Sequence, residues 1–159
     1  MKTIKPLLLA VGIMTPMLAL AAGSMDSHAS HGTTAKSAAG QPGKPAKVSR
    51  TVKVAMADTM RFTPDSITVK RGETVRFVVR NVGKLEHEMV IGTASELKEH
   101  AQMMRSMAAA RHAGPNQVTL APGQQGELIW QFDGPGTVDF ACLVPDHFDA
   151  GMVGKVVVK

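Results

Sequence analysis

Hydrophobic and polar residues alternate along most of the chain after residue 50. Val52, Val54 and Met56 occupy every second position, with Lys53 among the residues between them. The same two-residue period recurs over 67–69, 75–79 and 128–132. Because side chains of a β-strand point to its two faces in turn, this period predicts strands with one buried and one solvated face.

Turn-forming residues separate these segments. They occur at 63–65 (Thr-Pro-Asp), 71–72 (Arg-Gly), 81–83 (Asn-Val-Gly), 121–123 (Ala-Pro-Gly) and 133–136 (Asp-Gly-Pro-Gly). Short alternating strands with this spacing are typical of an antiparallel β-sandwich. We therefore predict one all-β domain over residues 50–159.

One segment lacks the two-residue period, from Ser95 to about Arg111. It is rich in the helix-forming residues Ala, Met, Glu, Lys and Leu, and Gly114-Pro115 would end it. Ser95 is the expected N-cap, with an incomplete capping box because Lys98 stands where Glu or Gln is usual. The sequence thus predicts one short helical insertion.

The first 22 residues have the pattern of an export signal. Lys2 and Lys5 precede an uncharged apolar run over 6–22 that ends in small residues. This predicts a signal peptide cleaved near Ala21 or Ala22. The alternative is a membrane anchor, but the run is short for a span of about 20 residues. We expect a mature chain without a membrane span, exported to the periplasm of a bacterium.

Residues 23–49 contain mostly Ser, Ala, Gly, Pro, Thr and Lys. Such a composition offers little to bury, so we predict a disordered linker. The linker contains Met25, His28 and His31. These side chains are either incidental or form an exposed arm that captures copper, because His and Met suit that metal.

The charge balance excludes one class of partner. The formal net charge is +5, and removal of Lys2 and Lys5 with the signal peptide lowers it to +3. The charges are scattered and not interleaved with aromatic residues, so we expect no nucleic-acid binding. About 137 residues remain, which suits one domain, and we expect a monomer.

The candidate chemistry lies near the C-terminus. The chain has one cysteine, Cys142, followed five residues later by His147 and after five more by Met152. An unpaired cysteine in an exported chain is a free thiol, an intermolecular bridge or a metal thiolate. The spacing favours the thiolate, because these groups with one more imidazole form the His2CysMet set of a type 1 copper site.

Strand alternation allows these groups to meet. Cys142 shares a face with Phe140, on the core side of its strand, and Met152 begins the last strand on the same face as Val156. His147 lies in the loop that joins the two strands. The sequence therefore predicts two inward-facing strand ends with a histidine between them.

Five histidines are candidates for the second imidazole: His28, His31, His87, His100 and His112. The first two lie on the predicted linker and the last two on or just after the helix. His87 begins a predicted strand in which Met89 and Ile91 share its face, and a rigid strand end suits a preorganised site. These considerations favour His87.

Several segments resemble the plastocyanin/azurin cupredoxin family. They are residues 60–77, Asn81, the run His87-Glu88-Met89, and the loop with Cys142, His147 and Met152. The spacing of that loop and the helical insertion are similar to periplasmic cupredoxins associated with bacterial copper tolerance. The resemblance covers about 52–159. It implies a Greek-key sandwich of about eight strands that binds one copper through His87, Cys142, His147 and Met152.

The resemblance implies a type 1 copper protein that cycles between Cu(II) and Cu(I) for one-electron transfer with periplasmic redox partners, in copper tolerance. The alternative is a dedicated respiratory or photosynthetic electron shuttle. We do not expect an enzyme, because multicopper enzymes need His-x-His pairs and a binuclear CuA site needs two cysteines. The chain has no His-x-His pair and one cysteine.

Three further expectations concern the surroundings of the site. His100, Met103, Met104 and Met107 share one helix face; they either pack the helix against the sandwich or form a weaker second copper site. Leu143 and Phe148 are expected to form an apolar docking patch around an exposed His147. Asp146 would either lower the reduction potential or alter partner docking, and Asn81 either supports the site or only forms a turn.

Overall fold

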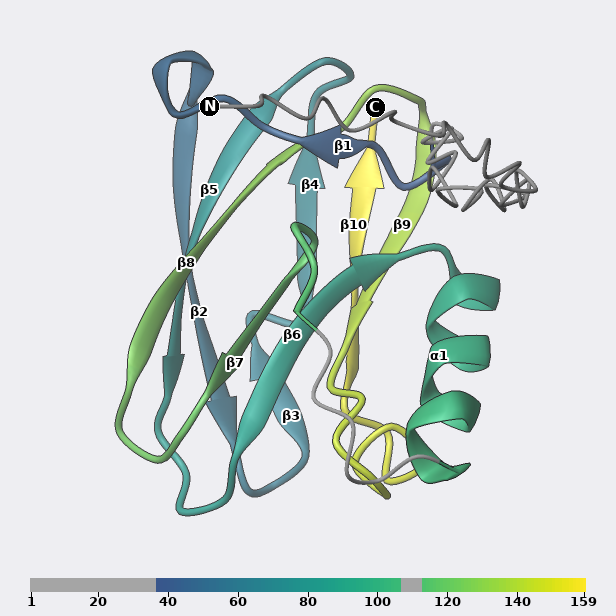
Figure 1. Ribbon diagram of the computed structural model, residues 1–159. Coiled ribbons are helices and arrows are strands. Elements are labelled where there is room, and N and C mark those ends of the chain that lie inside the picture. Colours follow the sequence, from purple (N-terminus) through teal and green to yellow (C-terminus); the bar gives the residue numbers. More distant parts are fainter. Residues whose placement is uncertain (1–36, 107–112) are drawn as a thin grey trace, which may run out of the picture. The chain divides into compact units, whose positions relative to one another are not determined.

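A computed structural model describes residues 37–106 and 113–159, which form two packed five-stranded sheets with one helix beside them (Figure 1). In spatial order, the first sheet contains β1 (Gln41–Pro42), β8 (Gln125–Gln131), β5 (Thr74–Asn81), β2 (Arg50–Ala57) and β3 (Arg61–Thr63). The second sheet contains β4 (Ser66–Val69), β10 (Val153–Val158), β9 (Gly136–Ala141), β6 (His87–Gly92) and β7 (Gln117–Leu120). The helix α1 spans Ala94–Ser106, and a single 3-10 turn, η1, spans Pro45–Lys47.

The predicted all-β sandwich with one helix is confirmed, with two differences in detail. The described residues contain ten strands where about eight were expected, and β1 and β3 are only two and three residues long. In addition, β2 pairs with β5 and β4 pairs with β10 in parallel, so the sheets are not purely antiparallel. Some consecutive strands lie in different sheets, as β3 and β4 do, and this crossing brings parallel strands together.

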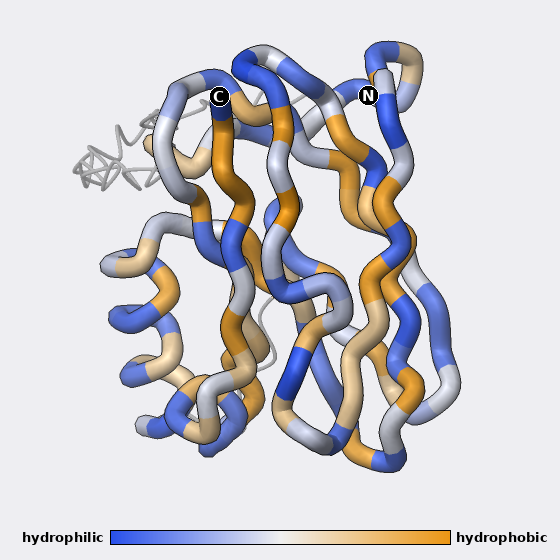
Figure 2. Tube along the Cα trace, turned by 180° about the vertical axis from the view of Figure 1, so that it is seen from behind, coloured by the Kyte–Doolittle hydropathy of each residue, from blue (hydrophilic) through white to orange (hydrophobic). Residues whose placement is uncertain are grey.

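The core lies between the two sheets and is filled by the alternating residues. Val54, Met56 and Phe77 from the first sheet and Phe140 and Val156 from the second are at most 2% exposed. The alternation is visible along the strands in Figure 2. The predicted faces of the strands are therefore correct.

The second sheet is buried on both faces where α1 covers it. All six residues of β6 are buried. Val90 of β6 and Ala141 of β9 point away from the main core and pack with Leu97 and Ala101 of α1. The helix thus covers the part of the second sheet that leads to Cys142 (Figure 1).

Thr93, not Ser95, caps the helix. The backbone N–H of Glu96 donates to Thr93 Oγ1 at 3.2 Å, and the N–H of Thr93 donates to the Glu96 carboxylate at 2.7 Å. This pair is a complete capping box. The expected N-cap at Ser95 was wrong, because it was placed two residues too late.

The methionines of α1 do not supply its buried face. That face consists of Leu97 and Ala101, whereas Met103 is 39% exposed and Met104 is half-buried. Packing of the helix therefore does not explain Met103. Met107 lies outside the described residues.

Residues 37–49, predicted to belong to a disordered linker, are part of the fold. Ala39 is buried, and its carbonyl accepts the indole N–H of Trp130 at 2.7 Å. Strand β1 pairs with β8, with Gln41 opposite Gln131. A buried indole needs an acceptor, and an open strand edge favours pairing, so these contacts explain the order.

The predicted signal peptide, the linker up to residue 36 and His112 lie outside the described residues. Within the part of the chain that the structure describes, no helix has the length and apolar character needed to cross a membrane.

Replacement of Thr93 by alanine should destabilise the protein by about 0.5–2 kcal/mol, the usual cost of losing an N-cap. The measurement is the free energy of unfolding in denaturant. Ser95→Ala is the matched control and should cost clearly less, because among the described residues the hydroxyl of Ser95 hydrogen-bonds that of Thr93 and no backbone N–H of the first turn. Equal losses in the two variants would contradict this assignment of the cap.

Candidate metal centre

The four predicted ligands come from one end of the second sheet. His87 is the first residue of β6, Cys142 follows the last residue of β9, and Met152 precedes the first residue of β10. His147 lies in the loop between β9 and β10. The strand pairings that align β6, β9 and β10 therefore also set the spacing of the ligands.

Two imidazoles face the thiol of Cys142. Its Sγ lies 4.0 Å from Nδ1 of His87 and 3.3 Å from Nδ1 of His147. The ligand atoms of these three residues all lie within 4.8 Å of one another. His87 and Cys142 have no exposed surface, and His147 is 8% exposed. The cluster is thus compact and almost closed to solvent.

Met152 is held next to Cys142 by the backbone. The N–H of Cys142 donates to the carbonyl of Met152 at 3.0 Å, and the N–H of Met152 donates to the carbonyl of His147 at 3.0 Å. The Met152 side chain is fully buried in the main core. These bonds close the loop from residue 142 to 152 into a compact turn.

The environment of Cys142 keeps the thiol protonated without a cation. Burial raises its pKa to about 12, although hydrogen bonds from the backbone N–H groups of Glu88 and Val144 act in the opposite direction. The N–H of Glu88 lies 3.4 Å from Sγ. A bound metal cation would supply the charge that deprotonates a coordinating thiol.

Glu88 joins the two strands that carry His87 and Cys142. Its carboxylate accepts the backbone N–H of Leu143 at 3.0 Å and the hydroxyl of Thr119 at 3.2 Å. Glu88 is only 6% exposed, and burial raises its pKa, against the effect of these two hydrogen bonds. The Glu88 side chain therefore fixes the strand end beside one ligand to the loop beside another.

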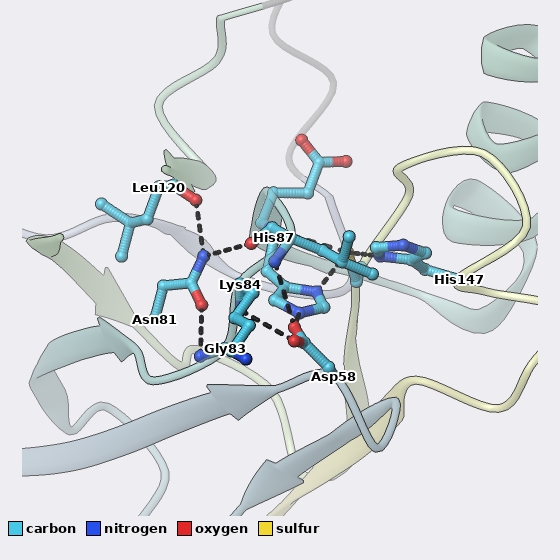
Figure 3. A network of polar contacts seen from close by, with 10 residues as sticks. Asp58, Asn81, Gly83, Lys84, His87, Leu120 and His147 are labelled. Atoms are coloured by element: carbon cyan, nitrogen blue, oxygen red, sulfur yellow. Dashed lines mark hydrogen bonds and ion pairs between the residues drawn. The ribbon is translucent and has the colours of Figure 1, made fainter. Parts of the chain in front are cut away.

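Asp58, in the turn between β2 and β3, contacts the far side of the His87 ring (Figure 3). Its Oδ1 lies 3.0 Å from Nε2 of His87. The backbone N–H of Lys84 lowers the pKa of Asp58 most, followed by the His87 ring. With Nε2 facing a carboxylate, Nδ1 of His87 faces the sulfur of Cys142.

The loop between β5 and β6 is held by Asn81, which is fully buried. Its side-chain N–H groups donate to the carbonyls of Leu85 and Leu120 at 2.7 and 2.9 Å, and its oxygen accepts the N–H of Gly83 at 2.9 Å (Figure 3). Asn81 thus supports the approach to His87 through the backbone.

His147 is suited to bind a metal as neutral imidazole. Burial lowers its pKa, and the nearby His87 adds to this effect, while the charges of Asp146 and Asp58 oppose it. A neutral ring keeps a lone pair available for coordination.

The apolar docking patch expected around His147 was wrong. Leu143 is 1% exposed and Phe148 packs against the cluster that α1 covers. Asp149 in the same loop forms an ion pair with Arg105 of the helix. The insertion therefore covers the face of the loop on which the patch was expected.

Three supporting residues escaped the sequence analysis: Asp58, Glu88 and Thr119. Glu88 carries a signal, because it is an acidic residue in a strand whose next three residues are apolar. Asp58 carries none, since it is 29 residues from His87 and lies in a turn where aspartate is ordinary.

The geometry of the cluster fits a soft or borderline metal ion. Nitrogen and sulfur bind zinc at roughly 2.0–2.3 Å, so ligands in one trigonal plane lie about 3.5–4 Å apart. Of the two separations from Sγ, 3.3 Å lies slightly below this range and 4.0 Å lies at its upper end. A set of two imidazoles, a thiolate and a thioether is typical of blue-copper sites.

Comparison with known proteins agrees with this chemistry. Residues 48–159 match the profile of the copper-binding proteins of the plastocyanin/azurin family. A relative from Rubrivivax gelatinosus, named copper-resistant cuproprotein CopI, is 60% identical over 110 residues, which cover 69% of this chain and 67% of the relative. A protein of the same name from Vibrio cholerae serotype O1 is 40% identical over 109 residues, or 68% and 64% of the two chains.

Solved structures share the fold at lower identity. Auracyanin B has a TM-score of 0.63 and 22% identity, covering 76% of this chain and 96% of its own. Dithionite-reduced auracyanin from Roseiflexus castenholzii has a TM-score of 0.61 and 23% identity, covering 70% and 98%. At these identities the similarity concerns the fold alone.

Proposed function

The chain belongs to the plastocyanin/azurin family of copper-binding proteins, and we propose that His87, Cys142, His147 and Met152 hold one copper ion in a type 1 site. Members of this family carry electrons and are not enzymes. The observation that carries the proposal is the buried cluster in which two imidazole nitrogens face one cysteine sulfur.

The protein's own contribution to electron transfer is a fixed and nearly dry ligand set. Copper bound there would supply a one-electron Cu(II)/Cu(I) couple. The hydrogen bonds of Glu88, Asp58 and the Cys142–Met152 turn hold the ligands, so little has to move when the charge changes. Of the three clustered side chains, His147 alone reaches the surface, so electrons would enter and leave through its ring.

We assign this activity to copper tolerance in the bacterial periplasm. The support is the 60% identical relative, which is named for copper resistance. The apolar run over 6–22 supports export. A periplasmic redox protein would be the electron partner. The alternative remains a respiratory or photosynthetic electron shuttle.

The face of α1 with His100, Met103 and Met104 is a candidate for a weaker second copper site. These residues lie at i, i+3 and i+4, so their side chains leave the helix on one side. Met103 is 39% exposed and is not required for packing of the helix. Thioether and imidazole groups suit Cu(I).

Addition of Cu(II) to the metal-free protein should give an intense visible absorption from thiolate-to-copper charge transfer, and Cys142→Ser should abolish it. The measurement is a spectroscopic titration to one equivalent. Met152→Leu is the control, because it leaves both imidazoles and the thiolate and should keep the band. A colourless wild-type protein at stoichiometric Cu(II) would contradict the type 1 assignment.

Deletion of the gene in its host should make growth sensitive to copper while respiration stays normal. Growth is measured over a range of copper concentrations, with complementation by the wild-type gene and by Cys142→Ser. Only the wild-type gene should restore growth if the type 1 site acts in tolerance. Impaired respiration with normal copper tolerance would favour the electron shuttle.

Titration with Cu(I) against a competing chelator should show two classes of site, one strong and one weak. The double variant Met103→Leu/Met104→Leu should lose the weak class, because it removes both thioethers and keeps good helix formers. The visible absorption of the Cu(II) form should be unaffected. A single class of site in the wild-type protein would exclude binding by this helix face.

A further inference from the structure

Asp58 is an acidic side chain in contact with the predicted copper ligand His87, and it lies outside the ligand loop. The carboxylate makes three contacts. Its Oδ2 accepts the N–H of Lys84 at 2.7 Å, and its Oδ1 accepts the N–H of Leu85 at 3.2 Å and faces Nε2 of His87 at 3.0 Å. Figure 3 shows it below the ring, on the side away from His147.

These contacts decide which ring nitrogen of His87 is available to a metal. An ionised carboxylate only accepts hydrogen bonds, so the ring nitrogen that faces it must carry the proton. The proton is therefore on Nε2, and the lone pair is on Nδ1. That atom faces the sulfur of Cys142 at 4.0 Å.

The space for this contact is provided by a glycine. A Cβ atom on Gly83 would lie 2.0 Å from Oδ1 of Asp58, so any larger residue would displace the carboxylate. The N–H of Gly83 donates to the side chain of Asn81, which is fully buried. The loop before His87 is thus held by Asn81 on one side and by Asp58 on the other.

His87 and His147 differ in whether a carboxylate hydrogen-bonds to the ring. Asp146 precedes His147, but it acts on that ring through its charge and not through a hydrogen bond among the described residues. A carboxylate that accepts the N–H of a ligand imidazole makes the imidazole a stronger donor and fixes its orientation. A stronger anionic environment favours the more highly charged Cu(II) state.

We propose that Asp58 is a positioning residue for the copper site, which fixes the tautomer and orientation of His87 and lowers the reduction potential of the bound copper. This proposal rests on copper binding by His87. Asp58, in the turn between β2 and β3, lowers the reduction potential more than Asp146 does.

The test compares Asp58→Asn with Asp146→Asn in the copper-loaded full chain. Both variants remove one negative charge close to a ligand histidine. Asparagine at position 58 keeps an oxygen that can accept the backbone N–H groups, so the loop retains an acceptor. The midpoint potential should rise in both variants and more in Asp58→Asn. Equal shifts would overturn the proposal.

A second readout follows the imidazole itself. In the reduced Cu(I) protein, the Nε2–H proton of His87 should appear at low field in a ¹H–¹⁵N correlation spectrum. It should move upfield in Asp58→Asn and stay in place in Asp146→Asn. An unchanged His87 signal in Asp58→Asn would show that the carboxylate does not hold this ring.

Gly83→Ala separates position from charge, because it displaces the carboxylate while the net charge stays the same. Its midpoint potential should also rise, and an unchanged potential would contradict the positioning role. The visible thiolate-to-copper band distinguishes the two levels of failure. Without the band in the wild-type protein, the proposed function fails; with the band but without these shifts, only the role of Asp58 fails.

Discussion

The metal centre depends on the hydrogen bonds that join the start of β6 to the loop after β9. The N–H of Glu88 reaches the sulfur of Cys142, and the carboxylate of Glu88 takes the N–H of Leu143. These bonds place Glu88, the residue after one ligand, against two consecutive residues of that loop, Cys142 and Leu143. A buried carboxylate is costly unless it is hydrogen-bonded. Loss of the contact with Leu143 would therefore destabilise the fold, and the contact is kept. The two hydrogen bonds of Glu88 therefore set the separation of His87 from Cys142.

The helix makes this arrangement possible. In a sandwich with one face exposed to water, Val90, Ala141 and Leu143 would be solvated, and the strand ends that carry the ligands would border on solvent. Packing of Leu97 and Ala101 over these residues buries the second sheet on both faces. The carboxylate of Glu88, two residues before Val90 on β6, is on a residue only 6% exposed, and such burial strengthens the hydrogen bonds that it makes.

Much of this could be predicted from the sequence, because the main signals are periodic or local. The alternation of Val54 and Met56, or of Phe140 and Cys142, directly reports which face is buried. The close spacing of Cys142, His147 and Met152 likewise indicates that one loop carries all three. The contacts that were missed are non-local and polar: the indole of Trp130 finds its acceptor 91 residues away, and His87 finds Asp58 29 residues away. Neither distance leaves a pattern in the sequence. The cap at Thr93 is a different case, since Thr93 and Glu96 have the spacing of a capping box and the signal was only misplaced.

The ion pair between Arg105 and Asp149, together with the packing of the buried Leu143 and the half-buried Phe148 beside α1, has a consequence for protein engineering. The segment between Cys142 and Met152 is not an independent module that can be exchanged for a ligand loop of another length. A transplanted loop would have to reproduce its fit to the helix as well as its ligand spacing. Grafts that carry α1 and the loop together should therefore retain the fold where grafts of the loop alone would not.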